Sequence, residues 1–543
     1  MYHDHFDEDF AGDIDVVANT YATMEDDIEE GEVIEDEIAM QNAKAGVDAI
    51  PEAVRNFVLN LQRCIRNKST SDISNMYDGQ FNRLTEKFYT KKPWPKPIYI
   101  ETLTNEGNEL YYRHIYSLLQ PTIDVRFNSY QNYCLLFNLI LNAQTPLDLE
   151  LPNQWLWDII DEFIYQYQAF CNYRSNISKK SPEEIESLKS HPDVWNTCSV
   201  LNVLYSLIHN AGPKKVSTDE DGTIEIRQPT NLYKMLGYFS HVGLLRVHCL
   251  LGDYTLALQA LENIELGNPR ALYTRVTACH VTVYYYVGFA YQMMRRYADA
   301  IRIFVQILTF ILRTRQFHPR SYQFDSVNKK GDQMYALLAI CVSLSPARID
   351  EHIHIHLREK YGDHQHKMQR GDKEALDVFK ELFLYACPKF VCPCEPNYDD
   401  PKAPAQEPQK YQANIFLKEV QLQLVVPTLR SFLKLYTAMS LDKLSNFLEM
   451  DESDLRTQLL MYKQRSRQVK WIPGSSLLDG EISPATDLDF GIQQNMIYIA
   501  ESKIGRRYAD WFIRNSTKFQ DMVNTLEVKQ RAAPTNAETT AAA

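Results

Sequence analysis

The stretch from Leu232 to Leu312 contains two tandem pairs of amphipathic segments that follow nearly the same pattern. At an offset of 43 residues, an aromatic, a small and several large apolar positions coincide: Tyr254 with Tyr297, Ala257 with Ala300, Leu258 with Ile301, Leu261 with Phe304 and Ile264 with Ile307. A small residue early in a helix lets two helices pack closely, and the large apolar residues leave a face for the next pair to cover. The repeat therefore predicts a helical solenoid, an architecture that binds proteins more often than it catalyses reactions.

The net charge of −13 comes from the beginning of the chain. Fifteen acidic residues and no Lys or Arg lie between Met1 and Ala43, so the rest of the chain is close to neutral. We expect residues 1–45 to form an acidic disordered tail, because blocks of acid with few aromatic residues bury little apolar surface. A neutral body gives no general indication of nucleic-acid binding, although local basic patches remain compatible with it.

The sequence also bears on location. The N-terminus lacks the basic, apolar and small-residue order of a signal peptide, and no apolar run reaches the roughly 18 residues of a membrane span. The ten cysteines are scattered from Cys64 to Cys394 through apolar segments, which is typical of free thiols in a reducing compartment. We expect a cytoplasmic protein without membrane contact.

Residues 46–231 read as an N-terminal helical region. Pro51 opens an amphipathic helix, a second follows through residues 73–88, and residues 149–170 are apolar on most of the helix circumference, as in a buried helix. Ser181 and Glu184 form a capping-box pattern at the start of a short helix. Residues 212–231 lack helical periodicity and are expected to form an exposed loop.

After the repeat, helices are expected near residues 333–344 and 348–361, followed by a connector over residues 388–410 whose six prolines exclude a long helix. Three helical segments then begin near Thr428, Ser440 and Asp451. The short segments VKWI, LLDGEI and NMIYIA look like strands of one small wing. Three helices followed by such a wing predict a winged helix, and a last helix follows over residues 501–527.

This order of helical repeats, winged helix and terminal helix resembles the PCI domain, which the proteasome lid, the signalosome and eukaryotic translation initiation factor 3 share. The resemblance is most detailed to an initiation factor 3 subunit. Seven stretches between Glu109 and Thr437 carry it, and it continues to about Leu526: ELYYRHIY, LPNQWLWDIIDEFIYQ, LYKMLGYFS, LLGDY, YYYVGFAYQMMRRYADAIR, LREKYGD and RSFLKLYT.

The resemblance implies a mainly α protein, a TPR-like solenoid followed by the winged helix of a PCI domain and a C-terminal helix. The expected parts are 1–45 (tail), 46–231 (helical region), 232–313 (TPR-like pairs), 308–514 (PCI domain), 501–527 (interaction helix) and 528–543 (tail). Within the PCI domain, residues 308–387 are helical, 388–410 form the connector and 411–500 the winged helix. It further implies a non-enzymatic cytoplasmic scaffold subunit that contacts other PCI and MPN subunits, subunit K among them, and supports binding of the small ribosomal subunit and mRNA.

Histidines and cysteines suggest one alternative, a metal site. The candidates are His352, His354, His356, His364, His366, Cys387, Cys392 and Cys394. His352 and His356 are four residues apart on a helix and could share an ion, but no compact CxxC pair accompanies them. We favour solvated histidines and free thiols, and we expect no cofactor.

The sequence contains no familiar catalytic motif. The MPN metalloprotease pattern fails, because the positions that require its serine hold Gly362 and His364. The chain contains no phosphate-binding GxxxxGK[ST] loop, no HExxH and no GxSxG. The sequence therefore predicts no enzyme, although a spatial triad leaves no linear trace.

A direct RNA-binding winged helix is the main rival function. Arg456, Lys463 and Arg467 lie beside the apolar stripe of the third helix, with Lys470 just after it, and such residues can contact phosphates. A solvated helix face is the simpler interpretation, because this region has no strong basic excess. A proteasome-lid or signalosome subunit is the alternative with the same fold.

The last helix carries an apolar stripe that can either pack on the winged helix or bind a partner helix. Its members are Ile504, Tyr508, Trp511, Phe512, Phe519, Met522 and Leu526. Because terminal helices of PCI subunits gather into a shared bundle, the resemblance favours a partner helix.

Overall fold

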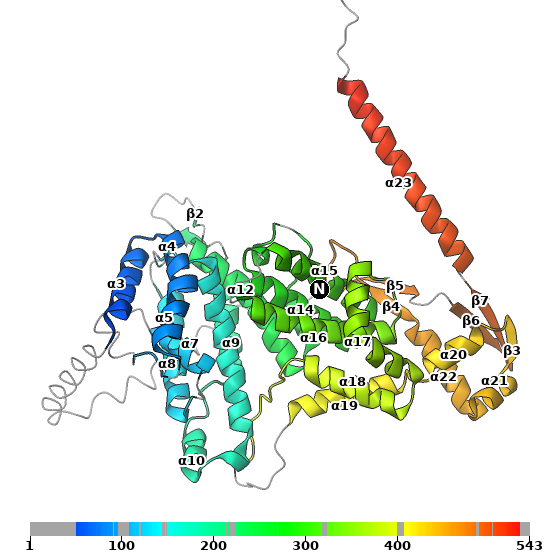
Figure 1. Cartoon of the computed structure of the whole chain (residues 1–543), viewed down its shortest axis with the longest axis horizontal. Helices are drawn as coiled ribbons and strands as arrows, with labels where there is room; N and C mark the ends of the chain where they lie inside the picture. The colour runs from blue at the N-terminus through cyan, green and yellow to red at the C-terminus, as the bar shows by residue number, and fades with distance from the viewer. Residues whose placement is uncertain are drawn as a thin grey trace, which may run out of the picture. The chain divides into compact units, whose positions relative to one another are not determined.

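The structure, a computed structural model, is mainly helical with a few short strands, as the sequence predicted (Figure 1). It describes residues 50–90, 92–95, 108–118, 121–143, 147, 149–212, 214–217, 224–227, 229–268, 270–317, 323–398, 407–484, 488–501 and 503–532. The predicted acidic tail and the end of the chain from residue 533 lie outside these ranges. No helix within the described residues is long and apolar enough to cross a lipid bilayer.

The chain divides into two compact units. Unit 1 consists of Met1–Gln166 and Asn210–Leu236, and unit 2 of Tyr167–His209 and Gly237–Ala543. Two of the divisions fall inside long helices, α9 (Asn153–Ser175) and α12 (Asn231–Leu251).

Unit 1 is built from the helices that precede α9 and from the first half of α9 itself. They are α3 (Glu52–Arg66), α4 (Thr70–Asn75), the π-helix η1 (Met76–Gln80), α5 (Phe81–Phe88), α7 (Asn108–Leu118) and α8 (Ile123–Leu141). Pro51 precedes α3 as predicted. The expected single helix over residues 73–88 is divided by η1, which contains Gly79 and carries Tyr77 into the core. There the Tyr77 ring stacks on Trp155 of α9 with a centroid distance of 4.8 Å.

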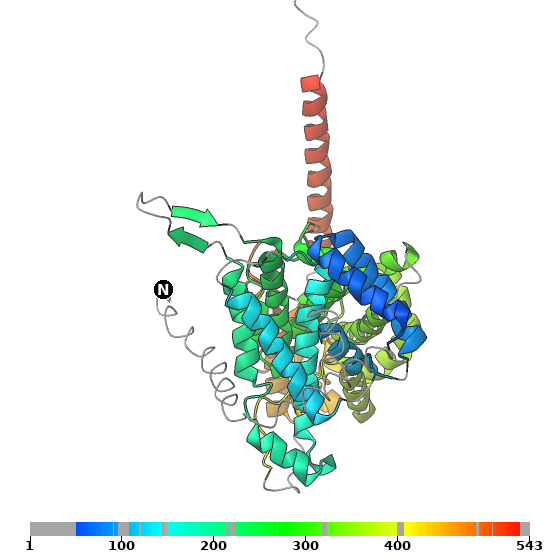
Figure 2. The same cartoon turned by 90° about the vertical axis from the view of Figure 1, so that its left-hand side faces the viewer.

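Unit 1 also contains a β-hairpin in the segment for which the sequence predicted an irregular loop. Strands β1 (Lys214–Ser217) and β2 (Ile224–Arg227) pair antiparallel, with Lys214 opposite Arg227 (Figure 2, green arrows). The loop prediction was therefore wrong for these eight residues. Isoleucines alternate with charged residues in β2, whereas β1 contains a single β-branched residue, Val216, so the period of two was too short to be recognised.

Unit 2 contains the repeat. Its helices are the end of α12, α13 (Tyr254–Gln259), α14 (Thr277–Met293) and α15 (Tyr297–Phe317), with the 3-10 turn η3 (Leu272–Arg275) before α14. The eight apolar positions that the offset aligned after the tyrosines are all buried: Ala257, Leu258, Leu261, Ile264, Ala300, Ile301, Phe304 and Ile307. The repeat thus identified core positions correctly.

The two members of the repeat differ in their second helix. Helix α13 ends at Gln259, whereas the equivalent α15 continues to Phe317. Leu261 and Ile264 are still buried, but they lie in turns, and Gly267 follows with a φ of 90°. Apolar spacing alone therefore overestimated the length of α13, because a turn buried the same side chains.

Other helices of unit 2 surround this repeat. They are α10 (Pro182–Ser190), α11 (Thr197–Asn210), α16 (Gln323–Leu344), α17 (Glu351–Arg370), α18 (Lys373–Ala386) and α19 (Pro408–Gln421), with η2 (Ile177–Lys179) before α10. The capping box of α10 is present, because Ser181 Oγ accepts from Glu184 N and Glu184 Oε2 accepts from Ser181 N. Helix α16 begins at Gln323, well before the predicted start at 333, and α17 continues to Arg370, well beyond the predicted end at 361.

The first part of the proline-rich connector is not helical, as predicted. Residues 387–398 run along two helices of unit 2: Val391 N donates to the carbonyl of Leu250 at 3.0 Å, and Gln168 Nε2 donates to that of Lys389 at 2.6 Å. Residues 399–406 lie outside the described ranges.

A winged helix follows. Helices α20 (Val426–Leu433), α21 (Leu441–Leu448) and α22 (Glu452–Arg465) accompany a three-stranded antiparallel sheet of order β3 (Ala438–Ser440), β7 (Met496–Glu501), β6 (Leu488–Gln493). Side chains from the helices and the sheet share one core: Leu429, Leu433, Met439, Leu441, Leu444, Leu455, Leu459, Tyr462, Leu488, Phe490 and Ile497. The sequence predicted the three helices and β7, but not β3 or β6.

Strands β4 (Arg467–Lys470) and β5 (Glu481–Pro484) form a separate antiparallel hairpin. The prediction of one wing from VKWI, LLDGEI and NMIYIA was therefore wrong: the first two contribute to this hairpin and the third to β7. The physical reason is that Trp471 and Leu477, between β4 and β5, are buried against the helical part of unit 2. The last helix, α23, spans Lys503–Ala532, five residues beyond the predicted end.

Candidate interaction surfaces

Two of the predicted basic residues tie α22 to the wing. Arg456 Nη2 donates to the carbonyl of Gln494, in the turn between β6 and β7, at 2.9 Å. Lys463 Nζ donates to the carbonyl of Phe490 and lies 3.7 Å from Asp489. Both cations therefore have a structural task within the winged helix.

The other two basic residues lie on the separate hairpin. Arg467 and Lys470 are the first and last residues of β4, and both are exposed. In the hairpin register Lys470 is opposite Glu481. The structure thus divides the four candidates between the wing and the hairpin, and direct RNA contact by any of them stays a prediction.

The hairpin is held to the helical repeat by a buried ion pair that sequence reasoning missed. Arg296 and Asp299, at the start of α15, are 6% and 3% exposed, and their Nη2 and Oδ2 atoms lie 2.9 Å apart. Asp299 accepts from Trp471 N at 3.0 Å, and Arg296 donates to the carbonyls of Leu477 and Leu478. A buried charge pair is stable when further hydrogen bonds satisfy it, as here. The run RRYAD is present in the sequence, but the segment that its Arg296 and Asp299 bind lies about 170 residues further along the chain.

Helix α23 presents the most apolar exposed surface among the described helices. Trp511, Phe512, Phe519, Met522 and Leu526 are each between 57% and 66% exposed. Ile513 and Val523, which the prediction omitted, are exposed as well. Ile504 and Tyr508 belong to α23, but their side chains lie outside the described part of the structure. Contiguous exposed apolar residues of this size mark interaction sites.

The spacing of this stripe is informative. From Tyr508, steps of four and three residues alternate through Phe512, Asn515, Phe519, Met522 and Leu526. A repeat averaging 3.5 residues is the spacing of a coiled-coil seam, and a polar residue within the seam can fix register. The arrangement is suited to binding another helix.

The histidine and cysteine candidates do not converge. The five histidines lie on α17, and Cys387, Cys392 and Cys394 follow α18. Among the described residues, no three His, Cys, Asp or Glu side chains come together as metal ligands. His356 Nδ1 instead lies 3.5 Å from Glu359, and all ten cysteines are free thiols.

Comparison with known proteins places the chain in a family. A family model described as "RNA polymerase I-associated factor PAF67" matches residues 125–519. A zebrafish (Danio rerio) protein is 48% identical over 88% of this chain and 89% of its own length, and a human (Homo sapiens) protein is 50% identical over 83% and 82%. A Mycosarcoma maydis protein is 48% identical over 89% of this chain and 75% of its own length.

These relatives carry one name, "Eukaryotic translation initiation factor 3 subunit L". Subunit L of that factor is also the protein that the seven sequence stretches resemble. The identities extend over most of the chain, so the proteasome-lid and signalosome alternatives are not supported. The chain belongs to the family of eukaryotic translation initiation factor 3 subunit L.

Proposed function

We propose that this chain is a non-catalytic scaffold subunit of the eukaryotic translation initiation factor 3 complex, acting in the cytoplasm. The observation that supports this proposal best is the apolar stripe of α23, which leaves five large side chains more than half exposed. Such exposure is unfavourable for an isolated chain and favourable for a subunit. The relatives are named as subunits of eukaryotic translation initiation factor 3, and in such a complex another subunit would cover the stripe.

The proposed occupant of the stripe is a helix of another initiation factor 3 subunit. Burying a large apolar side chain contributes about 1.5–3 kcal/mol, so the seven exposed apolar residues of α23 offer enough surface for stable helix pairing. Alternating steps of three and four residues match a helix better than an extended peptide, whose side chains alternate at every second residue.

The remaining parts of the proposal come from family resemblance. The PCI domain is taken as residues 308–514, with subunit K as a neighbour and other PCI and MPN subunits completing the scaffold. Through that scaffold the chain would support recruitment of the small ribosomal subunit and mRNA. Its mechanism is placement: helices and edges bind subunits, and no group reacts.

Changing the stripe tests the assembly role. Phe512→Ser together with Phe519→Ser should release the chain from its complex, because both residues are on the seam of α23 and each loses most of its apolar surface. The measurement is affinity purification of the tagged full chain from cells, followed by identification of the co-purifying subunits. Deletion of residues 503–543 should have the same effect.

A matched control uses the polar face of the same helix. Lys518→Ala and Asp521→Ala alter exposed residues between the seam positions and should leave co-purification unchanged. Normal recovery of initiation factor subunits with the seam variant would refute the role of α23. Recovery of lid or signalosome subunits with the unaltered chain would refute the assignment to the initiation complex itself.

Direct RNA binding remains the second candidate, because Arg467 and Lys470 expose their side chains on β4. Arg456 and Lys463 are also tied to the wing, so their reversal would disturb the fold as well as any RNA contact. Arg467→Glu with Lys470→Glu is therefore the cleaner variant. Lower ultraviolet crosslinking to RNA with intact subunit assembly would support direct contact, and unchanged crosslinking would leave the scaffold role.

A further inference from the structure

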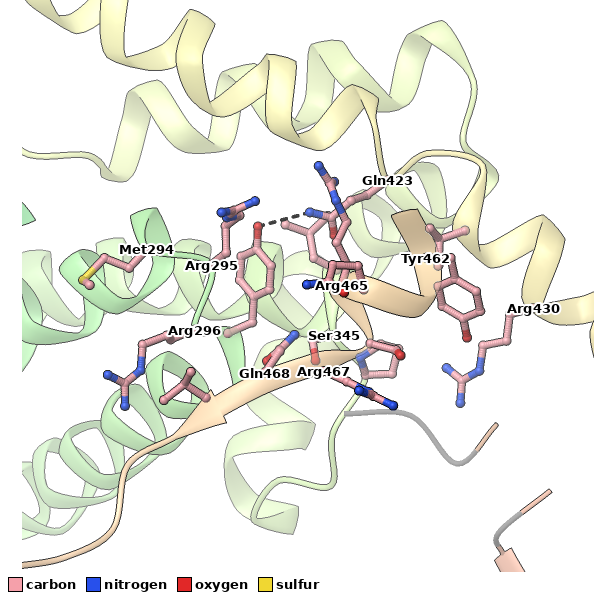
Figure 3. A pocket seen from close by; sticks show the side chains of 17 residues that line it. Met294, Arg295, Arg296, Ser345, Gln423, Arg430, Tyr462, Arg465, Arg467 and Gln468 are labelled. Atoms are coloured by element: carbon pink, nitrogen blue, oxygen red, sulfur yellow. Dashed lines mark hydrogen bonds between the residues drawn. The ribbon is translucent and has the colours of Figure 1, made fainter. Parts of the chain in front are cut away.

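An arginine-lined pocket lies between the helical repeat and the winged helix of unit 2. It encloses about 320 Å³ and is lined by the α14–α15 turn, the end of α16, α19–α20 and the α22–β4 turn (Figure 3). Five arginines contribute to its wall: Arg295, Arg296, Arg430, Arg465 and Arg467. No acidic side chain is among the described residues that line it, and none of the lining residues belongs to α23. We call this site the arginine pocket.

Carboxylates beside the pocket balance only some of these charges. Arg296 is paired with Asp299 and points to one end of the pocket in Figure 3. Glu419 serves two arginines, with its Oε1 atom 3.0 Å from Arg465 and 3.8 Å from Arg295. Among the described residues, Arg430 and Arg467 have no acidic partner, and the buried Nε of Arg430 has no hydrogen-bond acceptor. Counted over the described residues, the pocket therefore retains an excess of positive charge.

Unpaired guanidinium groups around a concave site suit a multiply charged oxyanion. Each guanidinium presents a planar fork of N–H donors that matches the oxygens of phosphate. Figure 3 shows Arg430, from α20, and Arg467, from β4, on the same side of the pocket. A doubly charged phosphoryl group would neutralise more of the excess charge than one carboxylate could.

The walls of the pocket favour a protein ligand over RNA. Single-stranded RNA is usually bound with bases stacked on exposed aromatic rings, but Tyr297 and Tyr462, the two aromatic residues here, are each only 3% exposed. Apolar side chains of Met294, Leu344 and Val426 line the pocket instead, beside the arginines. They would accept an apolar side chain next to a phosphorylated residue.

We propose that the arginine pocket binds a phosphorylated serine or threonine in a segment of another protein. Arg430 and Arg467 would contact the phosphoryl oxygens, and the apolar wall would contact a flanking side chain. Recognition of phosphorylated motifs by clustered arginines is an established mode of peptide binding. The proposal goes beyond the scaffold role and does not depend on α23, so either can fail alone.

The test starts with an array of synthetic peptides that fixes phosphoserine at the centre and varies the flanking residues, probed with the full chain. The peptide bound best is then measured in solution by fluorescence anisotropy in three forms, carrying phosphoserine, serine or glutamate. We expect the phosphorylated form to bind at least tenfold more tightly than the others. Fluorescein-labelled oligouridine is measured alongside as the RNA probe.

Variants of the pocket locate the binding. Arg430→Gln and Arg467→Gln should each weaken phosphopeptide binding about tenfold or more, as expected for loss of a hydrogen bond between charged groups. Arg358→Gln, an exposed arginine on α17 outside the pocket, should leave binding unchanged. Circular dichroism and thermal unfolding show which variants are folded, and either pocket variant suffices if the other is not.

Several results would overturn the proposal. These are binding of no peptide on the array, equally tight binding of the serine or glutamate form, and binding by both folded pocket variants that is as tight as that of the unaltered chain. Binding of oligouridine that is lost in Arg430→Gln, without phosphopeptide binding, would assign the pocket to RNA instead.

Discussion

Gly288 on α14 shows how tightly the repeat packs. A Cβ atom at this position would lie 2.5 Å from Cε1 of Phe304 on α15, and Phe304 is fully buried. Gly288→Ala gains about 1 kcal/mol of helix propensity but crowds a ring that cannot move aside, which costs about 1–3 kcal/mol. We expect a net loss of about 1 kcal/mol in the free energy of unfolding, measured by urea denaturation.

Gly362 on α17 provides the matched control. The nearest atom to a Cβ at Gly362 is Arg358 Cγ at 3.7 Å, which is ordinary contact. Gly362→Ala should therefore stabilise the protein slightly, by up to about 1 kcal/mol. If both substitutions changed the stability in the same direction, close packing of Gly288 would not be the cause.

At the residue scale, the sequence predicted which side chains are buried better than it predicted which residues they contact. The offset of 43 residues identified Ala300 and Phe304 as core positions, because helical periodicity reports which face is apolar. It could not show that Phe304 needs Gly288, or that Arg296 and Asp299 bind a segment near Trp471, since those contacts depend on how distant elements meet.

The β4–β5 hairpin depends on the same buried ion pair. Asp299→Asn keeps the size of the side chain but leaves Arg296 without a counter-charge, and a broken buried pair costs about 3–5 kcal/mol. We expect faster amide hydrogen exchange in residues 467–484, which the hairpin and its buried loop contain. The exchange is measured by mass spectrometry on the full chain.

A substitution at Arg295 is the control for the Asp299→Asn experiment. It is adjacent to Arg296, but its side chain is 60% exposed and its 3.8 Å contact with Glu419 is loose. Arg295→Gln should leave hydrogen exchange in the hairpin unchanged. Equal exchange in Asp299→Asn and the unaltered chain would mean that Trp471 and Leu477 hold the hairpin without the charges.

At the element scale, strong helices were predictable and short elements were not. Helix α22 follows from its apolar spacing and the start of α10 from its capping box, and both signals act locally. Strand β3 has only three residues, and its pairing with β7 connects segments far apart in the chain, whereas β6 pairs with β7 across the turn that contains Gln494. The predicted basic residues do not form one surface, because Arg456 and Lys463 contact the wing, whereas Arg467 and Lys470 belong to β4 of the separate hairpin.

For the whole molecule, the family resemblance supplied what local patterns could not. Periodicity indicated stacked helices, but only seven extended matches connected them to initiation factor 3, and the relatives then confirmed subunit L. The arginine pocket was not predictable, because its arginines come from three separated segments that meet only in the folded chain.

Burial raises the pKa of carboxyl groups in unit 1, which also contains one histidine with a lowered pKa, and it lowers the pKa of histidines in unit 2. In unit 1, burial raises the pKa of Glu162 and of Asp158 to about 7, and raises that of Asp78, while burial lowers the pKa of His114. In unit 2, burial lowers the pKa of His280 to about 4 and also lowers those of His241 and His248. His280 lies among aromatic rings, and its Nδ1 has no hydrogen-bond partner among the described residues.

These shifts predict opposite responses to acid. An acid whose pKa is raised on folding stabilises the fold at low pH, and Glu162 loses that contribution as pH rises from about 4.5 to about 7. A histidine whose pKa is lowered destabilises the fold as pH falls, for His280 from about 6.5 to about 4. Lowering the pH from 7 to 5 should therefore increase amide protection in unit 1 and decrease it in unit 2, after correction for intrinsic exchange.

Two substitutions assign the responses to these residues. Glu162→Gln should reduce the gain in unit 1, and His280→Phe, which fits the contacts with Tyr284 and Phe310, should reduce the loss in unit 2. Each variant should alter the pH dependence of amide exchange in its own unit, by an amount corresponding to about 1–3 kcal/mol between pH 7 and 5. Responses of the same sign in both units would contradict the prediction, because the carboxyls and histidines would then not control the pH dependence of stability.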